Sequence, residues 1–198
     1  MIEGLILASA SSARARLLAM AGLDVHIAPS AMDEAKIKRS FWVEGRPAAD
    51  CALALAEAKA RSVAGRDGAF VIGADQLLLC EGRWFDKPAD RAAARAQLRA
   101  LRGRAHELVT AVCVVKNGTR VWHTVSRPQL FMRQFSDAFL DDYLEAEAVA
   151  ALGSVGAYRL EGRGVQLFSR VEGDYFAILG LPLLELLGFL RHQGQIPT

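Results

Sequence analysis

The sequence predicts an α/β fold, a mixed β-sheet with flanking helices. Short apolar strands alternate with Ala- and Leu-rich helical segments, which indicates crossover connections. Asn117-Gly118 between two apolar runs indicates a hairpin, so parallel and antiparallel strands should occur together. The chain has 198 residues, of which 52% are hydrophobic, enough for the core of a single domain over residues 1–198.

The first half of the chain carries most of the candidate site residues. Gly22 and Gly65 are suited to end helices in the left-handed conformation. The expected elements are a strand from Leu5, a helix over 13–21, a strand over 25–27, a loop over 29–34, a mobile or cleft-rim polar segment over 35–46, a long buried helix over 48–64, and strands over 69–73 and 77–80 with a break at 74–76.

The second half is expected to combine hairpin strands with helices. Ser136 can cap one helix, and Pro182 can begin the last one. The expected elements are an irregular segment over 83–88, a helix over 90–101, strands over 107–115 and 119–125, a helix from 136 to about 147, strands over 155–160 and 165–171, and a helix from 182 to about 192.

Charge and cysteine content argue against several classes of protein. The 24 basic and 22 acidic residues give a net charge of +2, too balanced to indicate nucleic-acid binding. Cys51, Cys80 and Cys113 lie in apolar segments, as expected of reduced, buried thiols. Glu3 stands where a signal peptide is basic, and no apolar run approaches the roughly 20 residues that cross a bilayer. We therefore expect a soluble, cytoplasmic protein.

The stretch from Leu5 to Leu18 has the chemistry of a polyphosphate site. Its helix opens with Arg14 and Arg16, although a helix amino terminus already carries unsatisfied N–H groups and the positive end of the helix dipole. An anionic ligand would remove this conflict, and Ser9 could add a donor. A plain Ser-capped helix with solvated arginines is the alternative.

Asp75 is the strongest single candidate for chemistry. Its carboxylate follows a buried strand, and α/β proteins place ligand sites at strand ends. Burial would raise the pKa of Asp75 and favour a base, whereas a bound cation would lower that pKa. A turn-forming aspartate that caps local backbone groups is the alternative.

Two acids and two lysines could complete such a site. Asp33 and Glu34 offer oxygen ligands for Mg²⁺ or Mn²⁺, and Lys59 and Lys87 could bind phosphate. Each is ordinary alone, but with Arg14 they supply the cations, metal ligands and base that polyphosphate chemistry requires. Phosphate-loop, dinucleotide-binding, nucleophile-elbow and zinc-protease motifs are absent from the sequence.

A series of short motifs resembles the Maf-like nucleoside triphosphate pyrophosphatases along nearly the whole chain. The family opening Leu-Ala-Ser-x-Ser-Pro-x-Arg-x-x-Leu-Leu is matched over residues 7–18, with Ser12 in place of the proline. The further matches are Asp33-Glu34, Ala-x-x-Lys-Ala over 56–60, Ile72-Gly73-Ala74-Asp75, Lys87-Pro88, residues 101–110, and Gly180-Leu181-Pro182-Leu183.

The resemblance implies a central cleft, as in the Maf and inosine triphosphate pyrophosphatase folds, and a metal-dependent enzyme that cleaves a nucleotide between its α- and β-phosphates. In that family the Asp matching Asp75 accepts the proton of water, and the acid matching Glu34 helps with the Mg²⁺ or Mn²⁺ ion, for which Asp75 is the other expected ligand. A homodimer is also expected by resemblance. The residues that surround the phosphates in the family match Ser9, Arg14, Lys59 and Lys87.

Gln76 and Glu161 resemble the 7-methyl-GTP pyrophosphatase branch, because members acting on thymidine and uridine triphosphates usually carry Thr and Gln there. The Glu161 carboxylate can accept hydrogen bonds from guanine N1–H and the exocyclic amine, and it complements the positive methylated ring. Gln76 can donate and accept at a base edge. Ala13 replaces an arginine or aromatic residue linked to base selection, so dTTP, UTP, CTP or another modified nucleotide are alternatives.

Two other classes of function are alternatives. A nucleotide-binding regulator of cell division would bind triphosphates without turnover, although Asp75, Glu34 and the lysines favour catalysis. Nucleic acid could bind a helix face that carries four arginines, but the face lacks interleaved aromatic residues and is more typical of a solvated surface. These arginines are Arg91, Arg95, Arg99 and Arg102.

Overall fold

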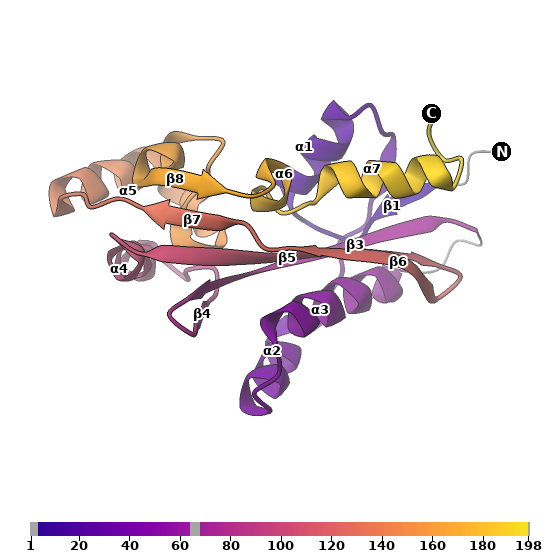
Figure 1. Ribbon diagram of the computed structural model, residues 1–198, viewed down its shortest axis with the longest axis horizontal. Coiled ribbons are helices and arrows are strands. Elements are labelled where there is room, and N and C mark those ends of the chain that lie inside the picture. Colours follow the sequence, from indigo (N-terminus) through magenta and orange to yellow (C-terminus); the bar gives the residue numbers. More distant parts are fainter. Residues whose placement is uncertain (1–3, 64–67, 198) are drawn as a thin grey trace. The chain divides into compact units, whose positions relative to one another are not determined.

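The computed structural model describes residues 4–63 and 68–197 (Figure 1). The predicted class is confirmed, since these residues form an open mixed sheet flanked by helices. The strands are hydrogen-bonded in the order β2-β1-β3-β5-β7-β8, with β4 paired to β3 and β6 paired to β5. Contacts divide the chain into two compact units, and strands β3 and β5 contribute residues to both. Unit 1 comprises the residues up to 75, residues 110–126 and the residues from 180, and unit 2 comprises 76–109 and 127–179.

Unit 1 contains the amino-terminal strands, four helices and one hairpin. Its elements are β1 (Leu5–Leu7), α1 (Ser12–Met20), β2 (Val25–Ile27), α2 (Glu34–Val43), α3 (Ala48–Val63), the first part of β3 (Phe70–Cys80), the second part of β5 (Ala105–Lys116), β6 (Thr119–Ser126) and α7 (Leu183–His192).

Helices cover both faces of the strands in unit 1 (Figure 1). Strand β1 is parallel to β2 and to β3, with Leu5 opposite Phe70 in β3. Successive side chains of a strand point to opposite faces. Phe70 contacts Phe189 of α7, with ring centroids 6.2 Å apart, whereas Gly73 lies against α3 on the other face. Odd-numbered positions of this part of β3 therefore face α3.

Unit 2 is built around one apolar cluster. Its elements are the second part of β3, β4 (Arg83–Phe85), α4 (Arg91–Leu101), the first part of β5, β7 (Gln129–Met132), α5 (Asp137–Leu152), the 3₁₀ helices η1 (Val155–Ala157) and η2 (Arg163–Leu167), β8 (Phe168–Glu172) and α6 (Tyr175–Ile178). Strand β7 is antiparallel to both β5 and β8. The cluster joins strand, helix and loop residues, among them Leu78, Leu98, Leu130, Leu140 and Tyr158.

Several sequence predictions are confirmed by this arrangement. Helix α1 ends before Gly22, which has a φ of +76°, and the β5–β6 hairpin turns at Gly118. Ser136 caps α5, its hydroxyl accepting a hydrogen bond from the Phe139 N–H at 3.1 Å. Helix α7 follows Pro182 as expected. The predicted helix end at Gly65 lies outside the described residues.

The cysteine prediction is also confirmed, because Cys51, Cys80 and Cys113 are buried and form no disulfide bond among the described residues. Burial raises the pKa of the Cys113 thiol to about 12, so it stays protonated at neutral pH. In the part of the chain that the structure describes, no helix has the length and apolar character needed to span a membrane.

Several element predictions are wrong or incomplete. The polar segment over 35–46 contains helix α2, because Asp33 caps it and Phe41 is buried on its inner face. The break at 74–76 does not exist, since β3 runs unbroken through Asp75. The strand predicted over 155–160 is replaced by η1, because Gly156 has a φ of +78°.

Strand β4, within the segment predicted as irregular, and strand β7 and helix α6 are elements that the sequence patterns did not indicate. All three are short, so they carry little periodic signal. Helix α5 also extends beyond the expected end near Glu147, to Leu152. The strand predicted over 165–171 begins only at Phe168, because the residues before it form η2.

Candidate functional site

Asp75 lies in the interior of β3, on the face that α3 covers, and is only 4% exposed. Its Oδ1 atom accepts a hydrogen bond from Lys59 Nζ at 2.6 Å. Its Oδ2 atom is buried and has no hydrogen-bond partner among the described residues. The prediction that Asp75 follows the end of a strand is therefore wrong: the lysine partner allows the carboxylate to stay inside the fold. A buried oxygen without a donor has unused capacity for a proton, a water molecule or a cation.

Close packing of α3 on β3 brings Lys59 to Asp75. A Cβ atom at Gly73 would overlap the carbonyl oxygen of Ala56 and would lie 2.9 Å from the Cβ of Ala60. The alanine face of α3 therefore lies directly on the strand, two residues before Asp75. Lys59 projects from the same helix and is only 7% exposed.

Glu34 is the second carboxylate on Lys59. It is the first residue of α2, and its Oε1 atom lies 2.8 Å from Lys59 Nζ. The Glu34 side chain is 42% exposed, whereas that of Asp75 is 6% exposed. The neighbouring Asp33 instead caps α2, where it accepts a hydrogen bond from the Lys36 N–H at 3.2 Å. Of the two acids offered by the sequence, the structure thus brings Glu34 to the lysine.

Arg14 and Ser9 form a second buried polar group in unit 1. Arg14 Nη1 donates to Ser9 Oγ at 3.0 Å, and Arg14 Nε donates to the carbonyl oxygen of Gly180 at 2.8 Å. Burial lowers the pKa of Arg14, and the carboxylates of Asp75 and Glu34 act in the opposite direction. The alternative of a solvated arginine is therefore wrong for Arg14.

A serine caps α1, as the alternative prediction of a Ser-capped helix expected. Ser11 Oγ accepts a hydrogen bond from the Arg14 N–H at 3.4 Å, and Arg16 is exposed. Ala13 is half-buried in the first turn of α1. Its methyl group has no donor, acceptor or ring with which to bind a base.

The other candidate residues belong to unit 2. Gln76 Nε2 donates to the carbonyl oxygens of Ala177 and Ile178, at 2.9 and 3.2 Å, so its amide group holds α6. Lys87 is exposed in the segment between β4 and α4. Gln76 therefore uses its amide nitrogen to bind the backbone of α6.

Glu161 precedes the 3₁₀ helix η2 and belongs to a chain of charged side chains. Its Oε1 atom accepts a hydrogen bond from Arg159 Nε at 3.2 Å. Arg159 also lies near Glu147, with Nη1 and Oε2 separated by 3.9 Å. The Glu161 side chain is only 19% exposed. The carboxylate is thus held against the protein.

The carboxylates of unit 1 fit a divalent cation that is completed by its substrate. Within residues 4–63 and 68–197, no group of three or more His, Cys, Asp or Glu side chains is arranged to hold a metal ion. Mg²⁺, however, is commonly bound by one or two carboxylates together with substrate phosphates. Glu34 and Asp75 meet at Lys59, and Oδ2 of Asp75 has spare coordinating capacity. The donor set therefore suits Mg²⁺ or Mn²⁺ that arrives with a phosphate ligand.

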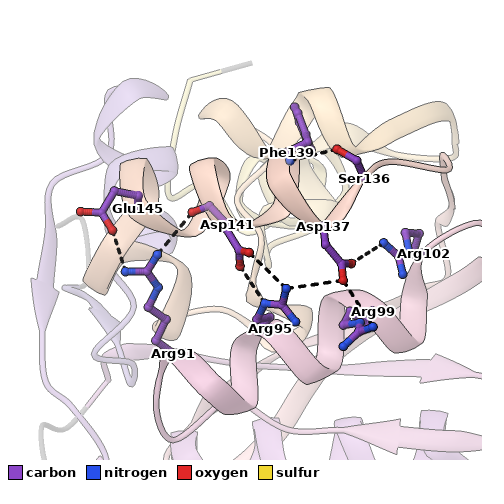
Figure 2. Close-up of polar contacts among 9 residues, drawn as sticks. All are labelled: Arg91, Arg95, Arg99, Arg102, Ser136, Asp137, Phe139, Asp141 and Glu145. Atoms are coloured by element: carbon purple, nitrogen blue, oxygen red, sulfur yellow. Dashed lines mark hydrogen bonds and ion pairs between the residues drawn. The ribbon is translucent and has the colours of Figure 1, made fainter.

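The arginine face of α4 pairs with carboxylates of α5 (Figure 2). Arg95 makes a two-point contact with Asp141, at 2.7 and 3.1 Å, and Asp137 lies within ion-pair distance of three arginines. The interpretation as a purely solvated face is therefore incomplete, because this face ties two helices together. The pairs are Arg91–Glu145, Arg95–Asp141, Arg95–Asp137, Arg99–Asp137 and Arg102–Asp137.

Sequence reasoning missed the residues that support the candidates rather than the candidates themselves. The carbonyl oxygen of Gly180 holds Arg14, and Glu147 lies behind Arg159. Gly180 belongs to the predicted motif Gly180-Leu181-Pro182-Leu183. Its φ of +100° is a conformation that glycine adopts far more readily than other residues. No local pattern marks Glu147, because its partners are 12 and 16 residues away in the chain.

A buried carboxylate with one oxygen unpaired among the described residues, a buried lysine and a buried arginine are features of an enzyme site that binds an anionic substrate. Comparison with known proteins names this class more closely. The family model described as "Maf-like protein" matches residues 4–193. The chain belongs to this family.

The curated relatives agree with this placement. A nucleoside triphosphate pyrophosphatase of Granulibacter bethesdensis is 58% identical over 192 residues, which cover 96% of this chain and 98% of the relative. One from Paramagnetospirillum magneticum is 54% identical, with 96% and 99% covered. A 7-methyl-GTP pyrophosphatase of Rhizobium meliloti is 48% identical, with 97% of each covered. The prediction of an enzyme of the nucleotide pyrophosphatase class, a hydrolase of acid anhydrides, is thereby confirmed.

Proposed function

We propose that this nucleoside triphosphate pyrophosphatase hydrolyses 7-methyl-GTP between the α- and β-phosphates, giving the monophosphate and pyrophosphate. The observation that carries the hydrolytic step is the Asp75 carboxylate, which is buried, bound to Lys59 through Oδ1 and without a partner at Oδ2 among the described residues. In the proposed step Oδ2 accepts a proton from water while the water oxygen bonds to phosphorus. The bond between that phosphorus and the bridging oxygen breaks, and the bridging oxygen leaves as part of the second phosphate product.

The basic residues have separate tasks in this mechanism. Lys59 binds Asp75 until the divalent cation takes its place, and then, with Arg14, it offsets the negative charge of the triphosphate. Ser9 holds the guanidinium of Arg14 in place and offers its hydroxyl to a phosphate oxygen. We assign Lys87, which is exposed and has a long, flexible side chain, to the same polyphosphate group.

Glu34 and Asp75 are the proposed protein ligands of a divalent cation. Such an ion, when bound, supplies positive charge to the phosphates and lowers the pKa of water. The support is the shared contact of both carboxylates with Lys59, which occupies the position between them. Binding of the cation would require Lys59 to shift from the carboxylates toward the phosphates.

The choice of base is assigned to Glu161, Gln76 and Ala13. A carboxylate at Glu161 matches the two adjacent donors of guanine, N1–H and the exocyclic amine, and its charge complements a methylated, cationic ring. The Rhizobium meliloti relative that is named for 7-methyl-GTP supports this choice. Ala13 would leave room beside the base rather than contact it.

The test is a panel of nucleoside triphosphates incubated with purified protein and Mg²⁺ or Mn²⁺, in which both pyrophosphate and monophosphate are measured. We expect the highest kcat/KM with 7-methyl-GTP. Asp75→Asn should lower kcat by about 10²–10⁴-fold, the usual contribution of a general base. The exposed Asp142 of α5 provides the control variant Asp142→Asn, which should retain full activity.

Two results would contradict the proposal. Full turnover by Asp75→Asn would remove this residue from the chemistry. Tight nucleotide binding without any turnover by the unmodified protein would favour a regulator that binds triphosphates.

A further inference from the structure

We propose that Arg159 is a positioning residue for base recognition, which fixes the Glu161 carboxylate and is itself restrained by Glu147. This inference rests on the proposed role of Glu161 in binding the base. Neither Arg159 nor Glu147 belongs to the motifs that identify the site. Both are placed by contacts that lie wholly within unit 2.

The side chains form a continuous chain of opposite charges. Arg159 Nε donates to Glu161 Oε1 at 3.2 Å, and Arg159 Nη1 lies 3.9 Å from Glu147 Oε2. The other oxygen of Glu147, Oε1, accepts a hydrogen bond from the Arg163 N–H at 3.0 Å. Glu147 projects from α5, so one helix residue restrains both the arginine and the segment that follows Glu161.

The backbone around these side chains is packed closely. A Cβ atom at Gly164 would overlap the carbonyl oxygen of Arg159 and lie 2.8 Å from its nitrogen, so only glycine fits there without a shift. A Cβ atom at Gly162 would approach Oε1 of Glu147 at 3.1 Å. The segment over 161–164 is therefore wrapped around Arg159 and Glu147.

These three charged side chains are more buried than those of an ordinary surface ion pair. The side chains of Glu147, Glu161 and Arg159 are 10%, 19% and 30% exposed. Exposed ion pairs gain little because water competes and long side chains lose entropy. In a partly buried site the same contacts restrict the orientation of a carboxylate, and base recognition depends on that orientation.

The contact with Arg159 is compatible with base binding by Glu161. Arg159 Nε donates to Oε1, and a carboxylate accepts more than one hydrogen bond. The three side chains together carry one net negative charge, which suits a cationic 7-methylguanine ring.

Positioning and simple charge make opposite predictions. If Arg159 only neutralised Glu161, removing the arginine would strengthen attraction of the cationic base and lower KM for 7-methyl-GTP. If Arg159 positions Glu161, removing it lets the carboxylate turn away and raises KM. The variant Arg159→Gln separates these cases, and Arg159→Lys retains the charge on a less constrained side chain.

The experiment measures kcat and KM with 7-methyl-GTP, GTP and UTP for five variants, which are Arg159→Gln, Arg159→Lys, Glu147→Gln, Arg163→Gln and Glu161→Gln. For Arg159→Gln we expect KM to rise about tenfold for the two guanine substrates, the loss typical of one hydrogen-bonded contact, with kcat changed little and UTP unaffected. Arg159→Lys should recover part of this loss, and Glu147→Gln should follow Arg159→Gln with a smaller effect. Arg163→Gln is the matched control, because Glu147 contacts only the backbone N–H of this exposed residue.

The outcomes distinguish this inference from the proposed function. A lower KM for 7-methyl-GTP in Arg159→Gln, or an equal loss for all three nucleotides, would overturn the positioning role. If Glu161→Gln loses guanine selectivity while both Arg159 variants keep it, Arg159 is excluded and Glu161 stands. If Glu161→Gln keeps the selectivity of the unmodified protein, the base-binding role of Glu161 fails, and the inference about Arg159 fails with it.

Discussion

Two groups of basic and acidic side chains in this protein differ in burial and in how completely their oxygens are paired. In unit 1, Lys59 and Asp75 are buried, and one oxygen of Asp75 has no partner among the described residues. In unit 2, the arginines of α4 and the carboxylates of α5 lie at the surface, where both oxygens of Asp141 accept hydrogen bonds from Arg95 (Figure 2).

The contrast shows that the number of charged residues is a poor guide to function. The α4 face is the densest arginine stripe in the sequence, yet its charges are satisfied between two helices. Buried charges are costly unless paired, so a fold that retains one with an unpaired oxygen gives up stability at that position. Such a position is expected where a ligand completes the pairing.

The largest expected effect comes from breaking the buried pair. Lys59→Met should destabilise the fold by about 3–5 kcal/mol, because it removes the lysine that pairs directly with the buried Asp75 carboxylate. It should also lower kcat/KM by about 100-fold through the loss of phosphate stabilisation. Urea unfolding and steady-state kinetics measure the two effects.

A double variant separates stability from activity. Lys59→Met combined with Asp75→Asn removes both charges, so it should be more stable than Lys59→Met alone while remaining inactive. If the double variant is the less stable of the two, the buried charge is not the source of the loss.

The next prediction concerns His106, a buried titratable residue whose hydrogen-bond partner is the neutral hydroxyl of Tyr158. Burial lowers the pKa of His106 to about 4, and its Nε2 atom lies 2.9 Å from the hydroxyl of Tyr158. The unfolded chain takes up a proton near pH 6.5 and the folded protein only near pH 4. Stability should therefore fall as pH drops through this window, by at most about 3 kcal/mol, since one pKa unit corresponds to about 1.4 kcal/mol.

His106→Gln tests this linkage through a difference between pH values. The loss of stability between pH 7 and pH 4.5 should be smaller in the variant than in the unmodified protein, whatever the variant does to stability at pH 7. Equal losses in both proteins would show that His106 is already protonated in the folded state or does not titrate.

The smallest effect is expected for the ladder of surface ion pairs between α4 and α5. Arg95→Gln removes contacts to Asp137 and Asp141, but water and the neighbouring arginines replace them. We expect slight destabilisation at low ionic strength, no difference at high salt, and activity within about twofold of the unmodified protein. Thermal unfolding at two salt concentrations and the nucleotide assay provide the measurements. A large loss of activity would mean that the ladder also supports the site.

The sequence predicted those parts of the fold that have clear periodicity or caps. Helix α4 begins after its cap Asp90, and the β5–β6 hairpin turns at Asn117-Gly118 as expected. The continuity of β3 could not be predicted, because a polar residue inside a strand normally indicates a break. Only its partner Lys59, 16 residues away in the chain, makes Asp75 acceptable there.

The candidate site was predicted as a set of residues but not as a geometry. The motif series named Arg14, Lys59 and Asp75, and the structure buries all three. The hydrogen bond of Arg14 to the Gly180 carbonyl spans 166 positions, and a contact at that separation leaves no local pattern. Asp33 and Glu34 looked equivalent in the sequence. The structure shows that α2 begins at Glu34, so Asp33 caps the helix and Glu34 contacts Lys59.

The close approach of Gly73 to α3 gives a structural reason for the alanines of that helix. The helix is rich in alanine, and Ala56 and Ala60 face a strand position that has no side chain of its own. Two backbones can approach this closely only when both contributing faces are small. A methyl group added at position 73 would therefore act as a spacer that lifts Lys59 from Asp75, so the small residues of α3 and β3 together set the spacing of the ion pair.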